Sequence, residues 1–425
     1  MNTYVFGMGA AGNKATLDLV ELKVINSDSY ALFNTNSGDI PRDQHSKFIQ
    51  LESEFEGGAA KDPAVGRAAM QNYLSDEKNV HDLYNSIPED VDFVSIITSV
   101  EGGTGSGATP ILADYIANVL DIPVHLFVFI GFHNEQVGMN NTIEFIKRLI
   151  ALSNVTIHII QNDKFNNAPT YKLKEKEANK YVGTLLDIIM GKGRQESTQN
   201  IDDADAYKLF TTPGIMGIVN INCSGRRSKT DMNAAVVEAF DSSVEADYGG
   251  DAQRLAMILN ASEATQAIFD DELQAVRYYT NNNGGPEEIY RHIQNDGTVN
   301  EYCIIVAAGM SPSETYINYL LNERGKLQAA NQRQKDANET LLEKLKSATT
   351  QNIANIADVG NKKEENEPSF VTEKTELPTI RKKKRPLSGG SFKINGFNSS
   401  DSDKSIEKSP MNYPPYPNNL PYPNN

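Results

Sequence analysis

Residues 101–110, EGGTGSGATP, combine the residue types that bind phosphate at the end of a predicted strand. The apolar run 91–100 (VDFVSIITSV) precedes them, and an apolar helical stretch, 109–120, follows. Glycines let the backbone approach phosphate oxygens, and the start of a helix presents free N–H groups and the positive end of its dipole. Thr104 and Ser106 add hydroxyl donors. The segment is therefore a predicted phosphate-binding loop, with a plain glycine-rich turn as the alternative. It lacks the Lys–Ser or Lys–Thr pair of a Walker loop.

Other glycine-rich or asparagine-rich segments follow predicted strands, at the edge where open α/β sheets bind ligands. They are GMGAAGN (7–13), NTN (34–36), GGAAKDPAVGRAA (57–69) and NDK (162–164). Alone, the G-x-G-x-x-G spacing of the first would indicate a dinucleotide. The acidic residue expected at the end of the second strand is missing, because NTN stands there. An NAD-dependent enzyme is thus the less favoured alternative, and several phosphate-binding turns in one sheet favour a nucleoside triphosphate.

Apolar runs rich in Val and Ile alternate with helical stretches over residues 1–165. Continuous apolar strands separated by helices are typical of a parallel sheet covered on both faces. We therefore predict a doubly wound α/β domain here. Its expected strands lie at 4–9, 29–36, 93–100, 124–132 and 155–163.

The rest of the chain divides by pattern and composition. A long helix is predicted over 171–193, ending at Gly191 and Gly193, because its apolar residues recur on one side. A second α+β region includes predicted strands at 214–223 and 301–310 and a helix at 231–240. A long helix rich in Glu, Lys, Gln and Ala then begins at Ser313. The predicted divisions are 1–170, 171–193, 194–311, 312–350 and a disordered basic, Pro- and Asn-rich tail at 351–425.

Composition limits the possible classes of protein. The net charge of −16 argues against binding of nucleic acid by the folded body. The two cysteines cannot form a disulfide framework and fit a reducing cytosol, so a cytoplasmic location is expected. No apolar stretch reaches the length of a membrane span, and the histidines show no metal-ligand spacing.

The order of these segments resembles the tubulin/FtsZ superfamily, whose signature loop reads GGGTGSG; Glu101 stands at its first glycine. The resemblance implies a GTP-binding domain, a central helix, a second domain, and GTP or GDP with Mg²⁺ as cofactors. Asn13 and Asn179 would then hydrogen-bond the guanine, since an amide both donates and accepts. The residues that it places at the nucleotide are Gly7, Met8, Gly9, Gly12, Asn13, Asn34, Asn36, Gly57, Gly58, Ala59, Ala60, Gly102, Gly103, Thr104, Gly105, Ser106, Gly107, Glu135, Asn162 and Asn179.

The resemblance also implies head-to-tail filaments in which GTP is hydrolysed between subunits by a loop with the motif N-x-D-x-x-D. We matched that motif to residues 220–225, where Asn220 and Asn222 are present and both aspartates are absent. Asp231 is the next acid, and it is either the catalytic acid on a longer loop or a plain helix N-cap. A nucleotide-gated polymer with little GTPase activity therefore stays open as an alternative.

Two further positions depart from the FtsZ pattern. In the ribose-contacting loop, FtsZ has Glu and Arg four residues apart, but Met139 follows Glu135 here. The aromatic residue that stacks on the base is replaced by Glu175, four residues before Asn179. The sequence therefore supports nucleotide binding more strongly than it supports specificity for guanine.

The long helix and basic tail are most similar to TubZ, the tubulin-like GTPases that partition plasmids and phages. That resemblance implies a filament that segregates DNA through a TubR-like adaptor, bound by the tail around Arg381–Arg385. Direct phosphate contact or a solvated charge run are the alternatives for these residues. A phage tubulin-like filament that positions DNA, or a filament for cell division, is an alternative function. No membrane partner is expected.

Overall fold

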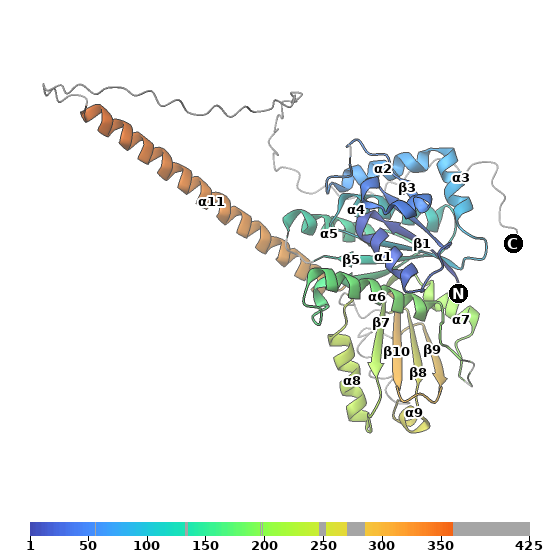
Figure 1. The fold of residues 1–425 in the computed structure, drawn as a ribbon. Coiled ribbons are helices and arrows are strands. Elements are labelled where there is room, and N and C mark those ends of the chain that lie inside the picture. The colour runs from blue at the N-terminus through green and yellow to red at the C-terminus, as the bar shows by residue number, and fades with distance from the viewer. Residues whose placement is uncertain are drawn as a thin grey trace. The chain divides into compact units, whose positions relative to one another are not determined.

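In the described part of the chain, one ten-stranded sheet connects the two halves of the structure (Figure 1). The computed structural model describes residues 1–55, 57–131, 135–195, 197, 199–245, 252–269 and 285–359, with side chains up to residue 347. Its strands lie in the order β3-β2-β1-β4-β5-β6-β7-β10-β8-β9. Met1–Asn331 form one compact unit, and a second unit begins at Gln332.

The amino-terminal half supplies six strands, β3-β2-β1-β4-β5-β6, and all of their pairings are parallel. All five strands predicted there are present, so the doubly wound α/β fold class is confirmed. The bounds are β1 Thr3–Met8, β2 Tyr30–Asn34, β3 Phe48–Gln50, β4 Phe93–Ser99, β5 Val124–Ile130 and β6 Val155–Gln161. Because all six strands point the same way, their carboxyl ends share one edge of the sheet.

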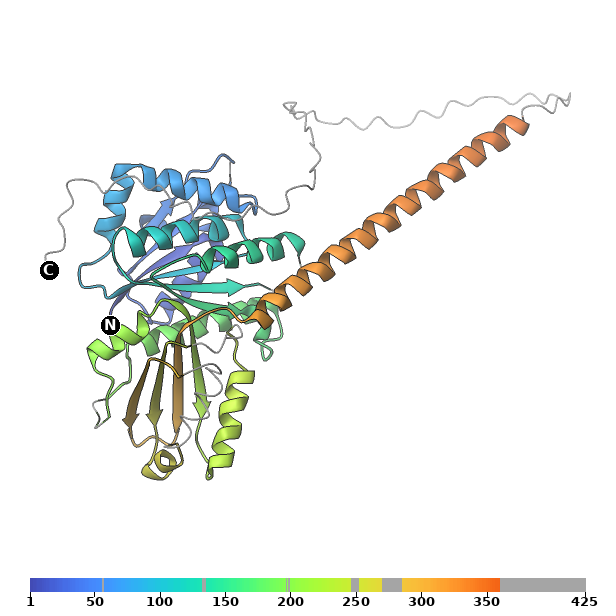
Figure 2. The same cartoon turned by 180° about the vertical axis from the view of Figure 1, so that it is seen from behind.

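Hydrophobic cores cover both faces of these strands, because successive side chains of a strand point to opposite faces. In β1, Phe6 and Met8 belong to one core and Val5 belongs to the other. The first core lies under α2–α5, and the second lies under α1, α6 and α7 (Figures 1 and 2). The bounds are α1 Gly9–Glu21, α2 Pro63–Ser75, α3 Glu77–Ser86, α4 Gly103–Asn118, α5 Gln136–Leu149, α6 Tyr171–Ile189 and α7 Asp203–Phe210.

The second half continues the same sheet through a short pairing of β6 with β7, at Thr156↔Gly214 and Ile157↔Ile215. Antiparallel β10 lies between β7 and β8, and β9 pairs parallel to β8. A third core lies between these strands and the helices α8 and α9. The bounds are β7 Gly214–Asn222, β8 Arg254–Asn260, β9 Glu288–Gln294, β10 Tyr302–Met310, α8 Lys229–Asp241 and α9 Glu263–Phe269.

Two helices differ in length from their predictions. The central helix α6 stops at Ile189 instead of 193, because Gly191 and Gly193 adopt positive φ angles of 77° and 81°. The last helix, α11 (Glu314–Val359), is longer than predicted, so 351–359 are helical rather than part of the tail. The remaining predicted tail, with Arg381–Arg385, lies outside the described residues. The domain divisions stay predictions. No described helix combines the length and apolarity needed to cross a membrane.

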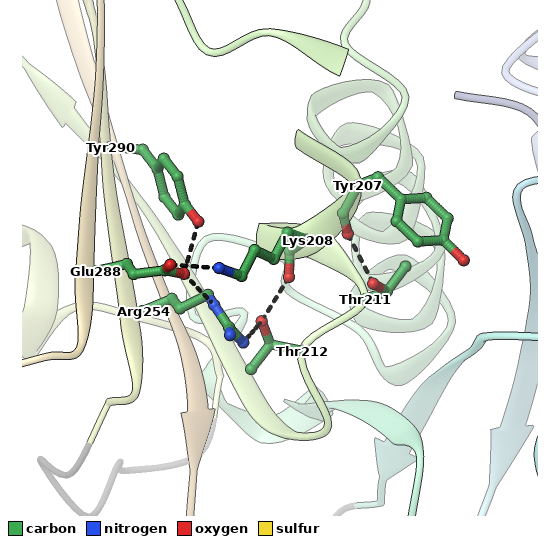
Figure 3. Close-up of polar contacts among 7 residues, drawn as sticks. All are labelled: Tyr207, Lys208, Thr211, Thr212, Arg254, Glu288 and Tyr290. Atoms are coloured by element: carbon green, nitrogen blue, oxygen red, sulfur yellow. Dashed lines mark hydrogen bonds and ion pairs between the residues drawn. The ribbon is translucent and has the colours of Figure 1, made fainter. Parts of the chain in front are cut away.

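A charged cluster fastens α7 to the second half of the sheet (Figure 3). The Glu288 carboxylate on β9 accepts hydrogen bonds from Arg254 Nε at 2.7 Å and Tyr290 OH at 2.8 Å, and also pairs with Lys208 of α7. Arg254 Nη1 donates to Thr212, just beyond α7, at 3.0 Å. Hydrogen bonds from Lys208, Arg254 and Tyr290 lower the pKa of Glu288 to about 2. The cluster therefore stays charged at neutral pH and fixes the carboxyl end of α7.

Two histidines are buried side by side between β5 and β6. His125 Nδ1 and His158 Nε2 are 3.1 Å apart, and Phe127 stacks on His158 with an interplanar angle of 8°. Burial lowers the pKa of His125 to about 3, and burial together with His125 lowers that of His158 well below its ordinary value. Both rings are therefore neutral in the folded protein.

This pair predicts a loss of stability in mild acid. The unfolded chain binds protons at these histidines below about pH 6.5, but the folded chain does not. Stability is then fully present above that pH and falls by about 1.4 kcal/mol per pH unit for each histidine below it. Urea unfolding of the protein between pH 7.5 and 5.5 should show this slope, and His158→Phe should reduce it. The exposed His81 gives the control, because His81→Gln should leave the slope unchanged.

The cluster around Glu288 predicts that Glu288→Gln loosens α7. Its carboxylate is needed to hold Lys208 and Arg254 together, so amide hydrogen exchange in α7 should become several-fold faster. Glu144→Gln, which breaks an exposed Glu144–Lys147 pair on α5, should leave exchange in α7 unchanged. Because the pKa of Glu288 is lowered, the wild-type protection should persist at neutral pH and fall only as the pH drops from about 4.5 toward 2. Equal exchange in both variants would contradict the role of the cluster.

Candidate functional site

A pocket of about 290 Å³ lies at the carboxyl ends of β1, β2 and β4. Its walls come from the segments that follow those strands and from the loop before α2. The lining residues are Met8, Gly9, Ala10, Ala11, Asn34, Thr35, Asn36, Asp39, Gly57, Gly58, Ala59, Ala60, Lys61, Ser99, Gly102, Gly103, Thr104 and Gly105. Four segments selected from the sequence for phosphate chemistry therefore meet at one place.

The two helices that begin at this pocket start without a capping side chain from any described residue. Met8 precedes α1 and Gly102 precedes α4, and neither makes a side-chain cap hydrogen bond. Elsewhere, α2, α3, α6, α7 and α8 are capped by the side chains of Asp62, Asp76, Thr170, Asp202 and Ser228, whereas α5 also lacks a side-chain cap. Uncapped helix starts leave N–H groups free and carry the positive end of the dipole. The pocket therefore offers converging donors for an anion such as phosphate.

Glycines at the pocket are required by close backbone contacts. A Cβ on Gly105 would lie 2.3 Å from Ser99 O, and one on Gly103 would lie 2.7 Å from Asp62 O. Gly9 has a φ of 71°, which favours glycine, and its Cβ would lie 3.3 Å from Gly105 N. A side chain at Gly9 would push α1 away from α4, whereas one at Gly105 or Gly103 would push α4 away from the end of β4 or from the loop before α2. The glycines thus line the pocket and also allow the close backbone contacts around it.

The NTN segment is held in place by an aspartate that the sequence did not single out. Asp39 accepts hydrogen bonds from Asn34 Nδ2 and from Asn36 Nδ2, each at 3.0 Å. Thr35 Oγ1 lies 2.7 Å from Thr104 Oγ1, which ties this loop to the signature loop. The amides of both asparagines are therefore oriented by the protein rather than by a ligand.

Several predicted nucleotide residues lie behind the pocket instead of lining it. Gly12 and Gly107 are packing positions, since a Cβ would come within 2.0 Å of Ile97 O and 2.1 Å of Pro63 O. Ser106 Oγ donates to Gly102 O, within the first turn of α4. The predicted residues outside the lining are Gly7, Gly12, Asn13, Ser106, Gly107, Glu135, Asn162 and Asn179. Lining residues that were not predicted are Ala10, Ala11, Thr35, Asp39, Lys61 and Ser99.

The asparagines predicted at the base are buried between α1, α6 and the strands. Asn13 Nδ2 donates to Phe33 O at 3.1 Å, and its Oδ1 has no partner among the described residues. Asn179 Nδ2 donates to Asp18 Oδ2 at 2.7 Å. The buried Oδ1 of Asn162 also has no partner in the described structure. Unpartnered buried acceptors of this kind are costly.

Glu101 occupies a half-buried position beside the start of α5. A Cβ on Gly131 would lie 2.0 Å from its carboxylate, so the neighbouring glycine makes room for it. Burial first, and then the charge of Glu135, raise the pKa of Glu101, and Lys61 partly offsets them. Glu101 does not line the pocket.

The residues matched to the catalytic motif lie elsewhere. Asn220 and Asn222 are in β7, which leads away from the amino-terminal half (Figure 1). Asp231 is in the first turn of α8, whose N-cap is Ser228 rather than Asp231. The first three residues of the stretch 220–225 are thus the end of a strand paired with β10, and the stretch is not a loop that follows the central helix.

A literal N-x-D-x-x-D string that the sequence reading missed follows the central helix, at Asn200-Ile201-Asp202-Asp203-Ala204-Asp205. Asp202 caps α7 by accepting from Asp205 N at 2.8 Å. The spacing of Asn200, Asp202 and Asp205 alone identifies this motif in the sequence.

This acidic turn lies at the sheet edge opposite the pocket. Thr156 Oγ1, near the start of β6, donates to Thr212 O at 2.9 Å, just beyond α7. Burial, and then Asp92 and Asp121, raise the pKa of Tyr207 on α7. Asp92 directly precedes β4 and Asp121 lies shortly before β5. The helix α7 therefore crosses the amino ends of the strands, whereas the pocket lies at their carboxyl ends.

Comparisons with known proteins agree with this geometry. Residues 2–169 match the model of the tubulin/FtsZ family, GTPase domain. The cell division protein FtsZ of Mycoplasmopsis pulmonis (strain UAB CTIP) is 26% identical over 329 residues, which cover 74% of this chain and 79% of that protein.

Solved structures show the same fold at low sequence identity. The crystal structure of Clostridium botulinum phage c-st TubZ aligns with a TM-score of 0.60 at 15% identity, covering 77% of this chain and 98% of TubZ. The GTPγS-form protofilament of Bacillus thuringiensis serovar israelensis TubZ aligns with a TM-score of 0.61 at 17% identity, covering 79% and 94%. Residues 2–169 therefore form a tubulin/FtsZ-family domain, within a chain that has the fold of tubulin/FtsZ proteins.

Proposed function

We propose that this protein binds GTP in the pocket at the carboxyl ends of β1, β2 and β4, polymerises head to tail, and hydrolyses GTP between subunits. The observation that carries the proposal is the pair of uncapped helix starts, at Gly9 and Gly103, that converge on one glycine-lined pocket. Free N–H groups and two dipole ends at one point favour a polyphosphate. The TubZ protofilament solved in its GTPγS form is a related protein with the same fold.

Different residues would bind the phosphates and the base of the nucleotide. The first turns of α1 and α4 would donate N–H groups to phosphate oxygens, and Thr104 would add its hydroxyl. Asn13, Asn162 and Asn179 would hydrogen-bond the base, as their open or exchangeable amide groups allow. Mg²⁺ would be held mainly by the phosphates, since Asp39 is the only described carboxylate that lines the pocket and both its oxygens already accept hydrogen bonds.

The acids that orient the attacking water would be Asp202 and Asp205, supplied by the next subunit. Parallel strands place α7 at the amino edge and the pocket at the carboxyl edge, so stacking subunits head to tail would bring the two together. This assignment replaces Asn220, Asn222 and Asp231. The alternative of a nucleotide-gated polymer with little GTPase activity rested on the absence of both aspartates. With this assignment it loses that support, because both aspartates of the motif are present, at 202 and 205.

The cellular role that we propose is DNA segregation by a cytoplasmic filament of the TubZ type. Leu341, Leu342 and Leu345 on α11 are more than half exposed, which suits contact with another protein chain. A TubR-like, DNA-bound adaptor would bind the basic tail around Arg381–Arg385. A filament for cell division or phage DNA positioning would use the same pocket, and adaptor binding distinguishes them.

The test compares GTP turnover and sedimentation over a range of protein concentrations for the parent, Asp205→Asn and Asp231→Asn. Turnover per molecule should appear only above a critical concentration, because the active site needs two subunits. Asp205→Asn should lower turnover by about 100-fold while pelleting with GTP persists. Asp231→Asn is the matched control and should behave like the parent.

Opposite results would change the assignment in different ways. Loss of turnover in Asp231→Asn alone would return the catalytic role to the end of β7 and the start of α8. A turnover per molecule that stays constant from nanomolar to micromolar protein would contradict an active site shared between subunits.

A further inference from the structure

The loop before α2 places a lysine against the glutamate that precedes α5. Lys61 Nζ lies 2.7 Å from Glu135 Oε1 and 2.6 Å from Glu135 Oε2. From its resemblance to FtsZ, the sequence was expected to carry an arginine four residues after Glu135, but Met139 stands there and is buried in the core. The structure therefore supplies a cation to Glu135 from a different loop.

Lys61 also lines the pocket. Among the described residues that line it, Lys61 is the sole cation, and it follows Gly57–Ala60 directly. The converging helix starts provide partial charges only, whereas the terminal phosphate of a nucleoside triphosphate adds a further full negative charge. A lysine ammonium on a flexible stem is suited to bind such a group as a point charge.

The backbone holds Lys61 in a strained conformation. Ala60 and Lys61 have φ angles of 48° and 60°, in the left-handed region that is unfavourable for a residue with a side chain. Asn141 Nδ2 fixes this turn by donating to Lys61 O at 2.9 Å and to Glu101 O at 3.0 Å. Helix α5 thereby holds the lysine loop and the signature loop together, and strain retained at a pocket indicates a functional position.

The ion pair can be exchanged at little cost. The side chains of Lys61 and Glu135 are 54% and 41% exposed, and an ion pair with such exposure contributes little to stability. A phosphate that carries more charge than one carboxylate, in a pocket that already favours anions, can therefore compete for the lysine. Only the side chain needs to move.

We propose that Lys61 binds the terminal phosphate of the bound nucleoside triphosphate and pairs with Glu135 when a diphosphate is bound. This inference rests on the proposed function, because it assumes that the pocket binds GTP. It assigns to Lys61 the discrimination between the two nucleotide states.

The test measures the binding of GTPγS and of GDP to the full chain, with Mg²⁺ and at nanomolar protein, for the parent and single variants. Lys61→Gln should weaken GTPγS binding by about tenfold and change GDP binding by about twofold at most. Lys61→Arg, which keeps the charge, should retain most of the preference for the triphosphate. Lys147→Gln, which breaks the exposed Glu144–Lys147 pair on α5, is the matched control and should change neither affinity.

Glu135 provides a second measurement that does not depend on any contact between Glu135 and the ribose. Such a contact would affect both nucleotides equally, so it cancels in the ratio of the two affinities. Glu135→Gln releases Lys61 and should raise the preference for GTPγS over GDP by about twofold to threefold. In the Lys61→Gln background, the same change should leave the ratio unaltered.

Each other outcome has a definite meaning. If Lys61→Gln weakens both nucleotides by the same factor, or weakens neither, the inference is overturned and the proposed function stands. If the parent chain binds neither nucleotide, the proposed function fails as well. Thermal unfolding of each variant shows whether an equal loss of both affinities comes from misfolding of the loop.

Discussion

Backbone contacts at glycines bring the helix starts together, and the rest of the site depends on them. A Cβ on Gly12 of α1 would meet Ile97 O of β4 at 2.0 Å, and one on Gly66 of α2 would meet Gly103 O of α4 at 2.3 Å. Helices can approach a strand or one another this closely only without side chains at the contact. Because α1, α2 and α4 are all fixed in this way, the starts of α1 and α4 meet the loop before α2 at one pocket, and neither α1 nor α4 has a side-chain cap there.

Because the strands are parallel, the anion-binding groups and the acidic groups lie at opposite edges of the sheet. Parallel strands give the sheet one edge of helix starts, where anions bind, and an opposite edge where the chain returns. Helix α7 lies along that opposite edge, with Asp202 at its N-cap and Asp203 and Asp205 in its first turn. The cluster at Glu288 fastens the other end of α7 to β8 and β9, so the second half of the sheet fixes the position of the acidic turn. One subunit thus carries an anion-binding edge and an acidic edge that face in opposite directions, which is the arrangement a head-to-tail polymer needs.

The sequence predicted those parts of the fold that depend on local pattern. Buried parallel strands are continuous apolar runs, so β1, β2, β4, β5 and β6 could be located, and Gly191 and Gly193 indicated the end of α6. The strand β8 has the same apolar character and could have been found. In contrast, β9 (EIYRHIQ) is only half buried, and α7 has only eight residues. Neither segment therefore shows a clear periodicity of apolar residues in the sequence. The motif at 200–205 depends on residue types and spacing rather than on periodicity, so it could have been found in the sequence.

Side-chain partners could not be predicted, because they join residues that are distant in the chain. Asp39 orients two asparagines, and Asn141 binds two loops 40 and 80 residues away. The pair of Lys61 and Glu135 is the clearest case. The sequence suggested that Glu135 had lost a cation, because Met139 stands where FtsZ has arginine. Met139 is buried in the core, where an arginine head group would need a partner of its own, whereas Lys61 brings the charge from a loop that already lines the pocket. The ion pair of Lys61 and Glu135 thus joins the loop before α2 to the start of α5, a contact between residues 74 positions apart in the sequence.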